Sequence, residues 1–211
     1  MTTAGVIRRR ARYDNRVATT FDRPPPFRTA AVPADIQALF LDRDGTLIED
    51  SHFVGDVEKV TLIPGTREAL ARLLEAGTKL FILTNQSGVN RGYFTLADVE
   101  AVNRRMIGLL DLGSAPFARI CIAPERPDEP SRYRKPSPRF IEEMLADHGL
   151  STAASWMIGD RPSDWEAGIA AGVRVAAITS SATQAEWDAR RLALGIRGYT
   201  SLLEWLDDAD R

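Results

Sequence analysis

Short apolar runs alternate along the chain with longer stretches in which apolar residues recur at helical spacing. Continuous apolar runs are typical of buried strands in parallel sheets. Such runs occur at 38–41, 79–83, 117–122, 155–159 and 173–178. Helical periodicity predicts helices over 66–76, 96–110, 137–148, 163–171, 184–194 and 201–206. Strands that alternate with amphipathic helices predict an α/β fold, with a Rossmann-like parallel sheet as the middle of three layers and helices on both faces.

Polar side chains follow several of the predicted strands at the point where each strand ends. These residues are Asp42, Asp44, Thr84, Asn85, Asp160 and Asp164. Because the carboxyl ends of parallel strands converge on one ligand-binding edge, we expect them to share a crevice with Lys135 from a nearby loop. Carboxylates suit a hard ion such as Mg²⁺, whereas lysine, hydroxyl and amide groups suit an anion. A metal site beside an anion site predicts phosphoryl transfer.

The composition limits the class of protein. The chain has 211 residues, of which 44% are hydrophobic and 27% are charged, as is typical of a globular protein with a substantial core. No apolar run is long enough to cross a bilayer and no secretory signal opens the chain, so we expect no membrane partner. A single cysteine, Cys121, excludes an internal disulfide framework and fits a reducing compartment, so we expect a cytoplasmic location.

Residues 1–34 differ in character from the rest of the chain. They carry seven arginines against two aspartates, a balance of +5, whereas the remainder has 20 basic and 27 acidic residues, a balance of −7. With a proline run at 24–26 and little apolar periodicity, this segment is predicted to be a disordered tail ahead of one domain at 35–211. A transit peptide and a nucleic-acid-binding arm are alternatives, but no aromatic stacking pattern supports nucleic acid as a partner.

Four short motifs, in this order along the chain, resemble those of the haloacid dehalogenase (HAD) superfamily of phosphotransferases. They are D-R-D-G-T-L at 42–47, T-N at 84–85, K-P at 135–136 and G-D-R-P-S-D at 159–164. The resemblance covers most of residues 37–180 and implies that Asp42 is a nucleophile, with Asp44 as the general acid and base. It also implies phosphoryl-group contacts from Thr84 and Lys135.

The same resemblance implies a Mg²⁺ site. Its ligands would be Asp42, Asp160 and the backbone carbonyl of Asp44. Asp164 would orient Lys135 or a metal-bound water.

Longer matches are similar to one subfamily, the D-glycero-D-manno-heptose 1,7-bisphosphate phosphatases and the related histidinol-phosphate phosphatases. They are D-R-D-G-T-L-I-E-D at 42–50, T-N-Q-S-G-V-N-R-G-Y-F-T at 84–95 and R-K-P-S-P at 134–138. This resemblance implies substrate contacts from Thr84, Asn85, Gln86, Ser87, Arg134 and Lys135. Arg161 stands where the heptose enzymes usually have a lysine, which keeps the charge but changes its geometry. Arg91 is a further candidate for contact with a second phosphate.

One departure from the subfamily concerns a structural zinc loop, C-x-H…C-x-C, that usually precedes the R-K-P motif. Its ligand positions here hold Ala123, Glu125, Ser131 and Tyr133. These side chains do not make a tetrahedral nitrogen and sulfur site, so we predict no zinc. Because this loop shapes the substrate wall in the subfamily, the replacement leaves the substrate open.

The spacing predicts an open site. Neither 43–65 nor the span between Asn85 and Lys135 has room for a cap domain. The leading hypothesis is a Mg²⁺-dependent phosphatase of a small phosphorylated metabolite, foremost a sugar bisphosphate. A histidinol-phosphate phosphatase, a polynucleotide 3′-phosphatase-like enzyme and a non-catalytic binding protein on the same fold are the alternatives. The sequence leaves the oligomeric state open.

Overall fold

The computed structural model describes residues 36–50, 57–179 and 184–209. It contains a six-stranded sheet with the order β3-β2-β1-β4-β5-β6, in which every neighbouring pair is parallel. The strands are β1 (Ala38–Leu41), β2 (Lys79–Asn85), β3 (Arg119–Ala123), β4 (Ser155–Gly159), β5 (Arg174–Ile178) and β6 (Gly198–Tyr199). The α-helices are α1 (Thr66–Glu75), α2 (Leu96–Leu110), α3 (Arg139–His148), α4 (Pro162–Ala170), α5 (Gln184–Ala193) and α6 (Leu202–Ala209). The predicted α/β fold is confirmed.

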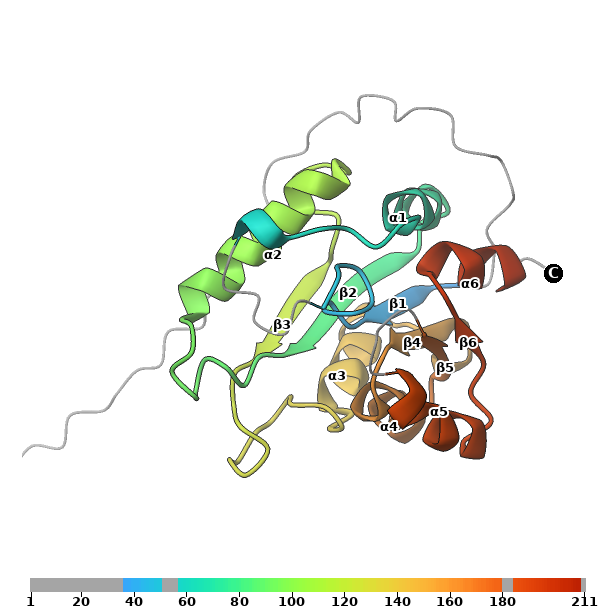
Figure 1. Ribbon diagram of the computed structural model, residues 1–211. Coiled ribbons are helices and arrows are strands. Elements are labelled where there is room, and N and C mark those ends of the chain that lie inside the picture. Colours follow the sequence, from blue (N-terminus) through green and yellow to red (C-terminus); the bar gives the residue numbers. More distant parts are fainter. Residues whose placement is uncertain (1–35, 51–56, 180–183, 210–211) are drawn as a thin grey trace, which may run out of the picture.

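Helices cover both faces of the sheet, with α1, α2 and α6 on one face and α3, α4 and α5 on the other (Figure 1). Strand β1 shows how the sequence specifies this arrangement. Leu39 and Leu41 belong to the cluster under α1, α2 and α6, whereas Ala38 and Phe40 pack with Phe140 of α3. Successive side chains of a strand point to opposite faces, so a strand buried on both faces must be apolar throughout.

The main difference from the expected elements is the sixth strand. Its two residues, Gly198 and Tyr199, pair with the end of β5 and are too few to give an apolar run. Element ends shift by one to three residues elsewhere; α3, for example, begins at Arg139 rather than 137. The predicted tail at 1–34 lies outside the described residues.

The strand order reverses between β1 and β4. One half of the sheet runs from β1 through β2 to β3, and the other runs from β4 outwards. The backbone N–H of Asp42 donates to the carbonyl of Ile158 at 3.0 Å, so the pairing of β1 with β4 continues to the start of the polar motif. At such a switch point the connecting loops diverge and leave a crevice.

The connections around this crevice carry no cap domain within the described ranges. The described parts of 43–65 contain a short 3₁₀-helix at Val57–Lys59 and isolated bridges from Ile48 to Asp44 and Leu62, and the span from 85 to 135 contains α2, β3 and loops. The sequence prediction of an uncapped domain is confirmed for these ranges. Over the same described residues, no helix has the length and apolar character needed to cross a bilayer.

Candidate active site

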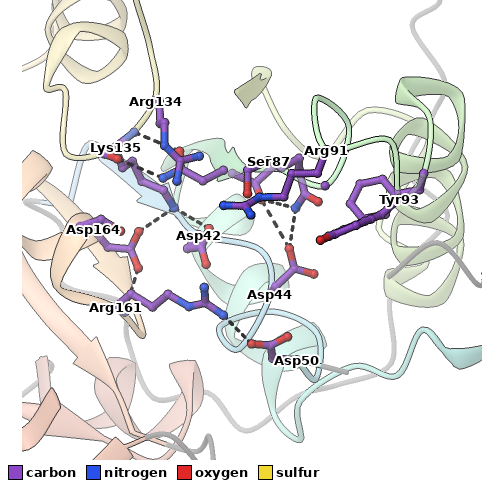
Figure 2. A pocket seen from close by; sticks show the side chains of 16 residues that line it. Asp42, Asp44, Asp50, Ser87, Arg91, Tyr93, Arg134, Lys135, Arg161 and Asp164 are labelled. Carbon is purple, nitrogen blue, oxygen red and sulfur yellow. Dashed lines mark hydrogen bonds and ion pairs between the residues drawn. The ribbon is translucent and has the colours of Figure 1, made fainter. Parts of the chain in front are cut away.

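A cleft of about 380 Å³ opens at the carboxyl end of the sheet (Figure 2). Ten residues singled out in the sequence line it: Asp42, Asp44, Thr84, Asn85, Gln86, Ser87, Arg134, Lys135, Arg161 and Asp164. Arg91 lines it as well, whereas Asp160 is fully buried next to it. The lining also includes Asp50, Tyr93 and Ser163, which the sequence analysis missed. Asp50 ends the longer match at 42–50, and Tyr93 lies within the match at 84–95, but neither residue type by itself indicated a role.

Three buried carboxylates gather around one point. Asp42, Asp160 and Asp164 each place an oxygen within 4.8 Å of the oxygens of the other two. Neither oxygen of Asp160 accepts a hydrogen bond from any described residue, and Arg161 Nε lies 3.8 Å from its Oδ2. A buried carboxylate without a donor is costly. The cluster therefore fits a hard divalent cation, which prefers several carboxylate oxygens.

The electrostatics of the cluster favour the same conclusion. Burial raises the pKa of Asp160 to about 8, and the charges of Asp42 and Asp164 contribute to that rise. Burial also raises the pKa of Asp42, although the ammonium group of Lys135 opposes the shift. Like charges held close together are stable only when a proton or a cation lies between them. A bound cation would take the place of the proton on Asp160.

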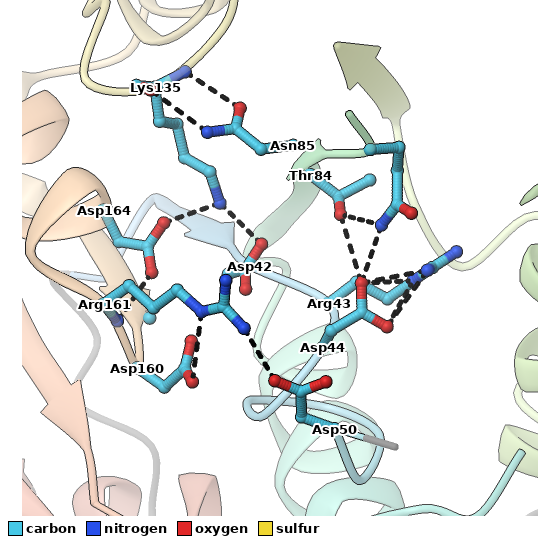
Figure 3. A network of polar contacts seen from close by, with 12 residues as sticks. Asp42, Arg43, Asp44, Asp50, Thr84, Asn85, Lys135, Asp160, Arg161 and Asp164 are labelled. Carbon is cyan, nitrogen blue, oxygen red and sulfur yellow. Dashed lines mark hydrogen bonds and ion pairs between the residues drawn. The ribbon is translucent and has the colours of Figure 1, made fainter. Parts of the chain in front are cut away.

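Lys135 supplies the positive charge inside the cluster. Its Nζ lies 2.5 Å from Asp42 Oδ1 and 2.6 Å from Asp164 Oδ1 (Figure 3). Burial alone would lower the pKa of Lys135, but the Asp164 and Asp42 carboxylates outweigh burial and raise it to about 12. Lys135 is therefore an ammonium at neutral pH, next to the carboxylate expected to act as nucleophile.

Asn85 fixes the backbone of Lys135. The Asn85 amide nitrogen donates to the carbonyl of Lys135, and its amide oxygen accepts from the N–H of Lys135, both at 3.0 Å. This pair joins the end of β2 to the loop before α3. Asn85 lines the cleft as expected for a substrate contact, but its two polar atoms are already engaged with the lysine backbone.

Two glycines leave room for the carboxylates. Gly45 has φ of +81°, and a Cβ there would lie 2.5 Å from Asp160 Oδ2. A Cβ on Gly159 would lie 2.3 Å from Asp164 Oδ2. Any side chain at either position would collide with a carboxylate of the cluster, so the close approach requires glycine.

Asp44 lies beside the carboxylate cluster rather than within it (Figure 3). Its Oδ2 accepts from Gln86 Nε2 at 2.7 Å and lies 3.5 Å from Thr84 Oγ1. The carboxylate also accepts from Arg43, with Nη2 to Oδ2 at 2.9 Å. The spacing of i and i+2 thus brings Asp42 and Asp44 to one cleft but gives them different partners. The side chain of Asp44 is separate from the three clustered carboxylates, so only its backbone carbonyl would join the expected metal ligands.

Arg161 is the residue directly before helix α4, at the edge of the cleft. Its N–H donates to Asp164 Oδ2 at 3.0 Å, which closes the first turn of α4 and fixes the Asp164 carboxylate. Its guanidinium reaches Asp50 Oδ2 at 2.6 Å (Figure 2). Half of the Arg161 side chain is exposed, so this cation faces both the cleft and solvent.

Hydrogen bonds hold the loop at 123–136, which contains Arg134 and Lys135. Ser131 Oγ accepts from the N–H of Arg134 and donates to Glu125 Oε2, both at 3.0 Å. Arg134 Nη1 donates to the carbonyl of Glu125 at 2.9 Å. The pKa of Arg134 is lowered by burial, and the positive charge of Arg91 adds to that effect. Arg91 and Arg134 thus line the same cleft as Lys135 and Arg161, and an anion suits these positive charges.

Comparison with known proteins places this geometry in a family. Residues 132–199 match a family model described as HAD-hydrolase-like. The D-glycero-beta-D-manno-heptose-1,7-bisphosphate 7-phosphatase of Pseudomonas putida is 34% identical over 140 residues, which are 66% of this chain and 80% of that protein. The D-glycero-D-manno-heptose-1,7-bisphosphate 7-phosphatase of Chlorobaculum tepidum is 38% identical over 151 residues, 65% of this chain and 76% of the relative.

A solved structure agrees with these relatives. The crystal structure of D,D-heptose 1,7-bisphosphate phosphatase from B. bronchiseptica, complexed with magnesium and phosphate, superposes with a TM-score of 0.71 at 27% identity. The match covers 82% of this chain and 97% of that chain. By this sequence identity and coverage, the chain belongs to the HAD-like hydrolases, in the family of the D-glycero-D-manno-heptose-1,7-bisphosphate 7-phosphatases.

Proposed function

We propose that this chain is a Mg²⁺-dependent phosphatase that removes one phosphate from a sugar bisphosphate of the heptose 1,7-bisphosphate type. The observation that carries the proposal is the buried group of Asp42, Asp160, Asp164 and Lys135 at the base of an open cleft. Family membership makes the chain a phosphoric monoester hydrolase. The named substrates of the relatives support the bisphosphate as substrate.

In the proposed reaction, a carboxylate oxygen of Asp42 attacks the phosphorus atom of the ester. The bond from phosphorus to the sugar oxygen breaks as the new bond to Asp42 forms, and Asp44 gives its proton to the departing oxygen. Lys135, 2.5 Å from Asp42, stands where it can neutralise an oxygen of the arriving phosphoryl group. The products of this step are an alcohol and an aspartyl-phosphate.

The second proposed step returns the enzyme to its starting state. Asp44, now a carboxylate, takes a proton from water as that water attacks the phosphorus atom. The bond from phosphorus to Asp42 breaks and inorganic phosphate leaves. The open cleft fits this step, because water must reach the covalent intermediate.

Mg²⁺ fits the donor set of carboxylate oxygens, and its proposed ligands are Asp42, Asp160 and the backbone carbonyl of Asp44, with Asp164 close by. Bound there, the ion would offset the negative charge of phosphate and carboxylates. Asp164 has a second role in this proposal, because its ion pair with Lys135 holds the ammonium beside the nucleophile.

The raised pKa of Asp160 predicts that Mg²⁺ binding releases a proton. Below about pH 8 the metal-free carboxyl is protonated, and the cation needs the carboxylate. The apparent affinity for Mg²⁺ should therefore rise by up to ~10-fold per pH unit between about pH 6 and pH 8, and level off above. Titration calorimetry in two buffers of different ionisation heat measures the released protons. Equal heats in both buffers near pH 6.5 would contradict this assignment; Asp160→Asn should abolish the pH dependence.

Substrate choice is tested by a panel of esters in the presence of Mg²⁺. We expect the highest kcat/KM for D-glycero-D-manno-heptose 1,7-bisphosphate, with histidinol phosphate and a DNA 3′-phosphate well below it. A preference for histidinol phosphate or the DNA end would replace the substrate assignment while keeping the reaction. Absence of hydrolysis for every ester would favour a non-catalytic binding protein.

The second phosphate is proposed to lie near Arg91 and Arg134. Arg91→Ala or Arg134→Ala should raise KM for the bisphosphate at least ~10-fold, which corresponds to about 1.4 kcal/mol of binding. The same changes should leave kcat/KM for a small monophosphate within about threefold, because that substrate lacks the second anion. Arg126→Ala is the matched control. Arg126 belongs to the same loop as Arg134, but it pairs with Asp128 and does not line the cleft. Equal losses on both substrates would place the arginines elsewhere in the mechanism.

The absence of zinc stays a prediction. Glu125 and Ser131, at two of the usual ligand positions, are joined by a hydrogen bond, and Glu125 also accepts from Arg134 through its carbonyl. We expect metal analysis of the purified protein to find no stoichiometric zinc, and zinc chelators to leave its stability unchanged. Zinc bound at one equivalent would contradict the prediction.

The cytoplasmic location is also kept as a proposal. Cys121 is buried, and burial raises the pKa of its thiol to about 12, so the thiol resists oxidation.

A further inference from the structure

Arg43, between the two aspartates of the first motif, is fully buried. Arginine is rarely buried unless its donors are satisfied by partners. Here Nε and Nη2 donate to the carboxylate of Asp44 at 2.9 to 3.3 Å. Nη1 donates to the side-chain oxygen of Asn103 at 2.9 Å. The guanidinium thus joins Asp44 to Asn103, which lies 60 positions after Arg43 in the chain.

Asn103 belongs to the middle of helix α2 and is itself buried. A buried asparagine inside a helix is unfavourable unless its amide has a partner. An amide oxygen can accept from Arg43 without bringing a negative charge that would compete with Asp44 for the guanidinium. Asn103 therefore suits a role in which it holds Arg43 but leaves the charge of Arg43 directed at Asp44.

The opposite side of the Asp44 carboxylate is fixed as well. Gln86 Nε2 donates to Asp44 Oδ2 at 2.7 Å and lies 2.8 Å from Thr84 Oγ1. The carboxylate is thus held between Arg43 and Gln86, while 16% of the Asp44 side chain remains exposed to the cleft. The Arg43 side of this clamp is anchored to helix α2 through Asn103.

We propose that Asn103 is a positioning residue for proton transfer: it orients Arg43, and Arg43 holds Asp44 at the angle needed to protonate the leaving oxygen. This inference rests on the proposed function, in which Asp44 is the general acid. It assigns a role to a helix residue that lies outside every motif and outside the cleft lining.

The leaving group tests the proposal. An alkyl phosphate needs a proton on its departing oxygen, whereas p-nitrophenyl phosphate releases a stable anion and needs little help. Asn103→Leu should lower kcat/KM for the alkyl phosphate by about 10- to 100-fold. This is part of the rate enhancement that a general acid typically supplies. The rate for p-nitrophenyl phosphate should stay within about threefold. Asn103→Asp, which draws Arg43 away from Asp44, should have a similar effect.

Each variant is judged by the ratio of the two rates in one sample, because partial unfolding lowers both rates equally. Val102→Ala is the matched control, since Val102 is a buried neighbour on α2 in the apolar core, and it should leave the ratio unchanged. Asp44→Asn is the reference variant for loss of the acid. If Asp44→Asn changes the ratio and Asn103→Leu does not, the positioning role is wrong. If Asp44→Asn leaves the ratio unchanged, or the wild type cleaves neither ester, the proposed function itself fails and this inference fails with it.

Discussion

Asp42→Asn should abolish turnover while the protein keeps its fold. The amide has almost the same shape as the carboxylate but cannot form an aspartyl-phosphate, so we expect kcat to fall by at least ~10⁴-fold, as is typical when a covalent nucleophile is removed. The fold should survive because Lys135 retains Asp164 as its ion-pair partner at 2.6 Å. Replacing one of three clustered carboxylates also reduces the repulsion between them.

The measurement is single-turnover kinetics on the preferred ester, together with thermal unfolding. Wild-type protein quenched in acid during turnover should carry phosphate on the peptide that contains Asp42, and Asp42→Asn should carry none. Deamidation restores a carboxylate, so mass spectrometry must show that the variant still contains asparagine. Turnover at the wild-type rate by a verified variant would overturn the mechanism.

Lys135→Met should have the second-largest effect, on stability as well as on rate. The change leaves Asp42, Asp160 and Asp164 buried together without the ammonium that now lies within 2.6 Å of two of them. Breaking a buried ion pair by removing one partner typically costs about 3–5 kcal/mol of unfolding free energy. We also expect kcat to fall at least ~10²-fold, because one electrostatic contact to the phosphoryl group is lost.

The dependence of the lost unfolding free energy on pH and Mg²⁺ shows whether unpaired carboxylates cause it. Without Lys135, the folded-state pKa values of Asp42 and Asp160 lie further above their unfolded values, so protonation stabilises the fold. The deficit in unfolding free energy should therefore be largest near pH 8, shrink towards pH 6 and be partly offset by Mg²⁺. Lys79→Met is the control, since Lys79 is an exposed lysine at the start of β2, and surface changes typically stay within about 0.5 kcal/mol. A deficit independent of both pH and Mg²⁺ would instead indicate lost packing.

Much of the site could be predicted because each motif follows directly from an element that periodicity identifies. Asp42 comes one residue after a wholly buried strand, and Thr84 and Asp160 occur at the ends of two of its parallel neighbours. Once the strands are predicted to be parallel, their carboxyl ends must meet at one edge. The chemistry of the residues at that edge then limits the reaction.

The remaining features depend on contacts that periodicity does not encode. The partnership of Arg43 with Asn103 joins a loop to a helix interior, and a lone asparagine in a helical pattern carries no signal of its own. The pairing of Asn85 with the backbone of Lys135 depends on how a loop closes over β2. Similarly, the sequence shows that zinc ligands are missing from the positions before Arg134. It does not show that Ser131 and Glu125, at two of those positions, form a hydrogen bond.

The central position of β1 has a consequence for the order in which the protein matures. Strand β1 is the first strand of the domain to leave the ribosome, yet it needs β2 on one edge and β4 on the other. Asp42 is synthesised long before Asp160 and Asp164, and the intervening chain contains α1, β2, α2, β3, α3 and β4. Contacts between residues so far apart form late and slowly. The nascent chain therefore has no carboxylate cluster until β4 docks, and phosphatase activity should appear only after that docking step.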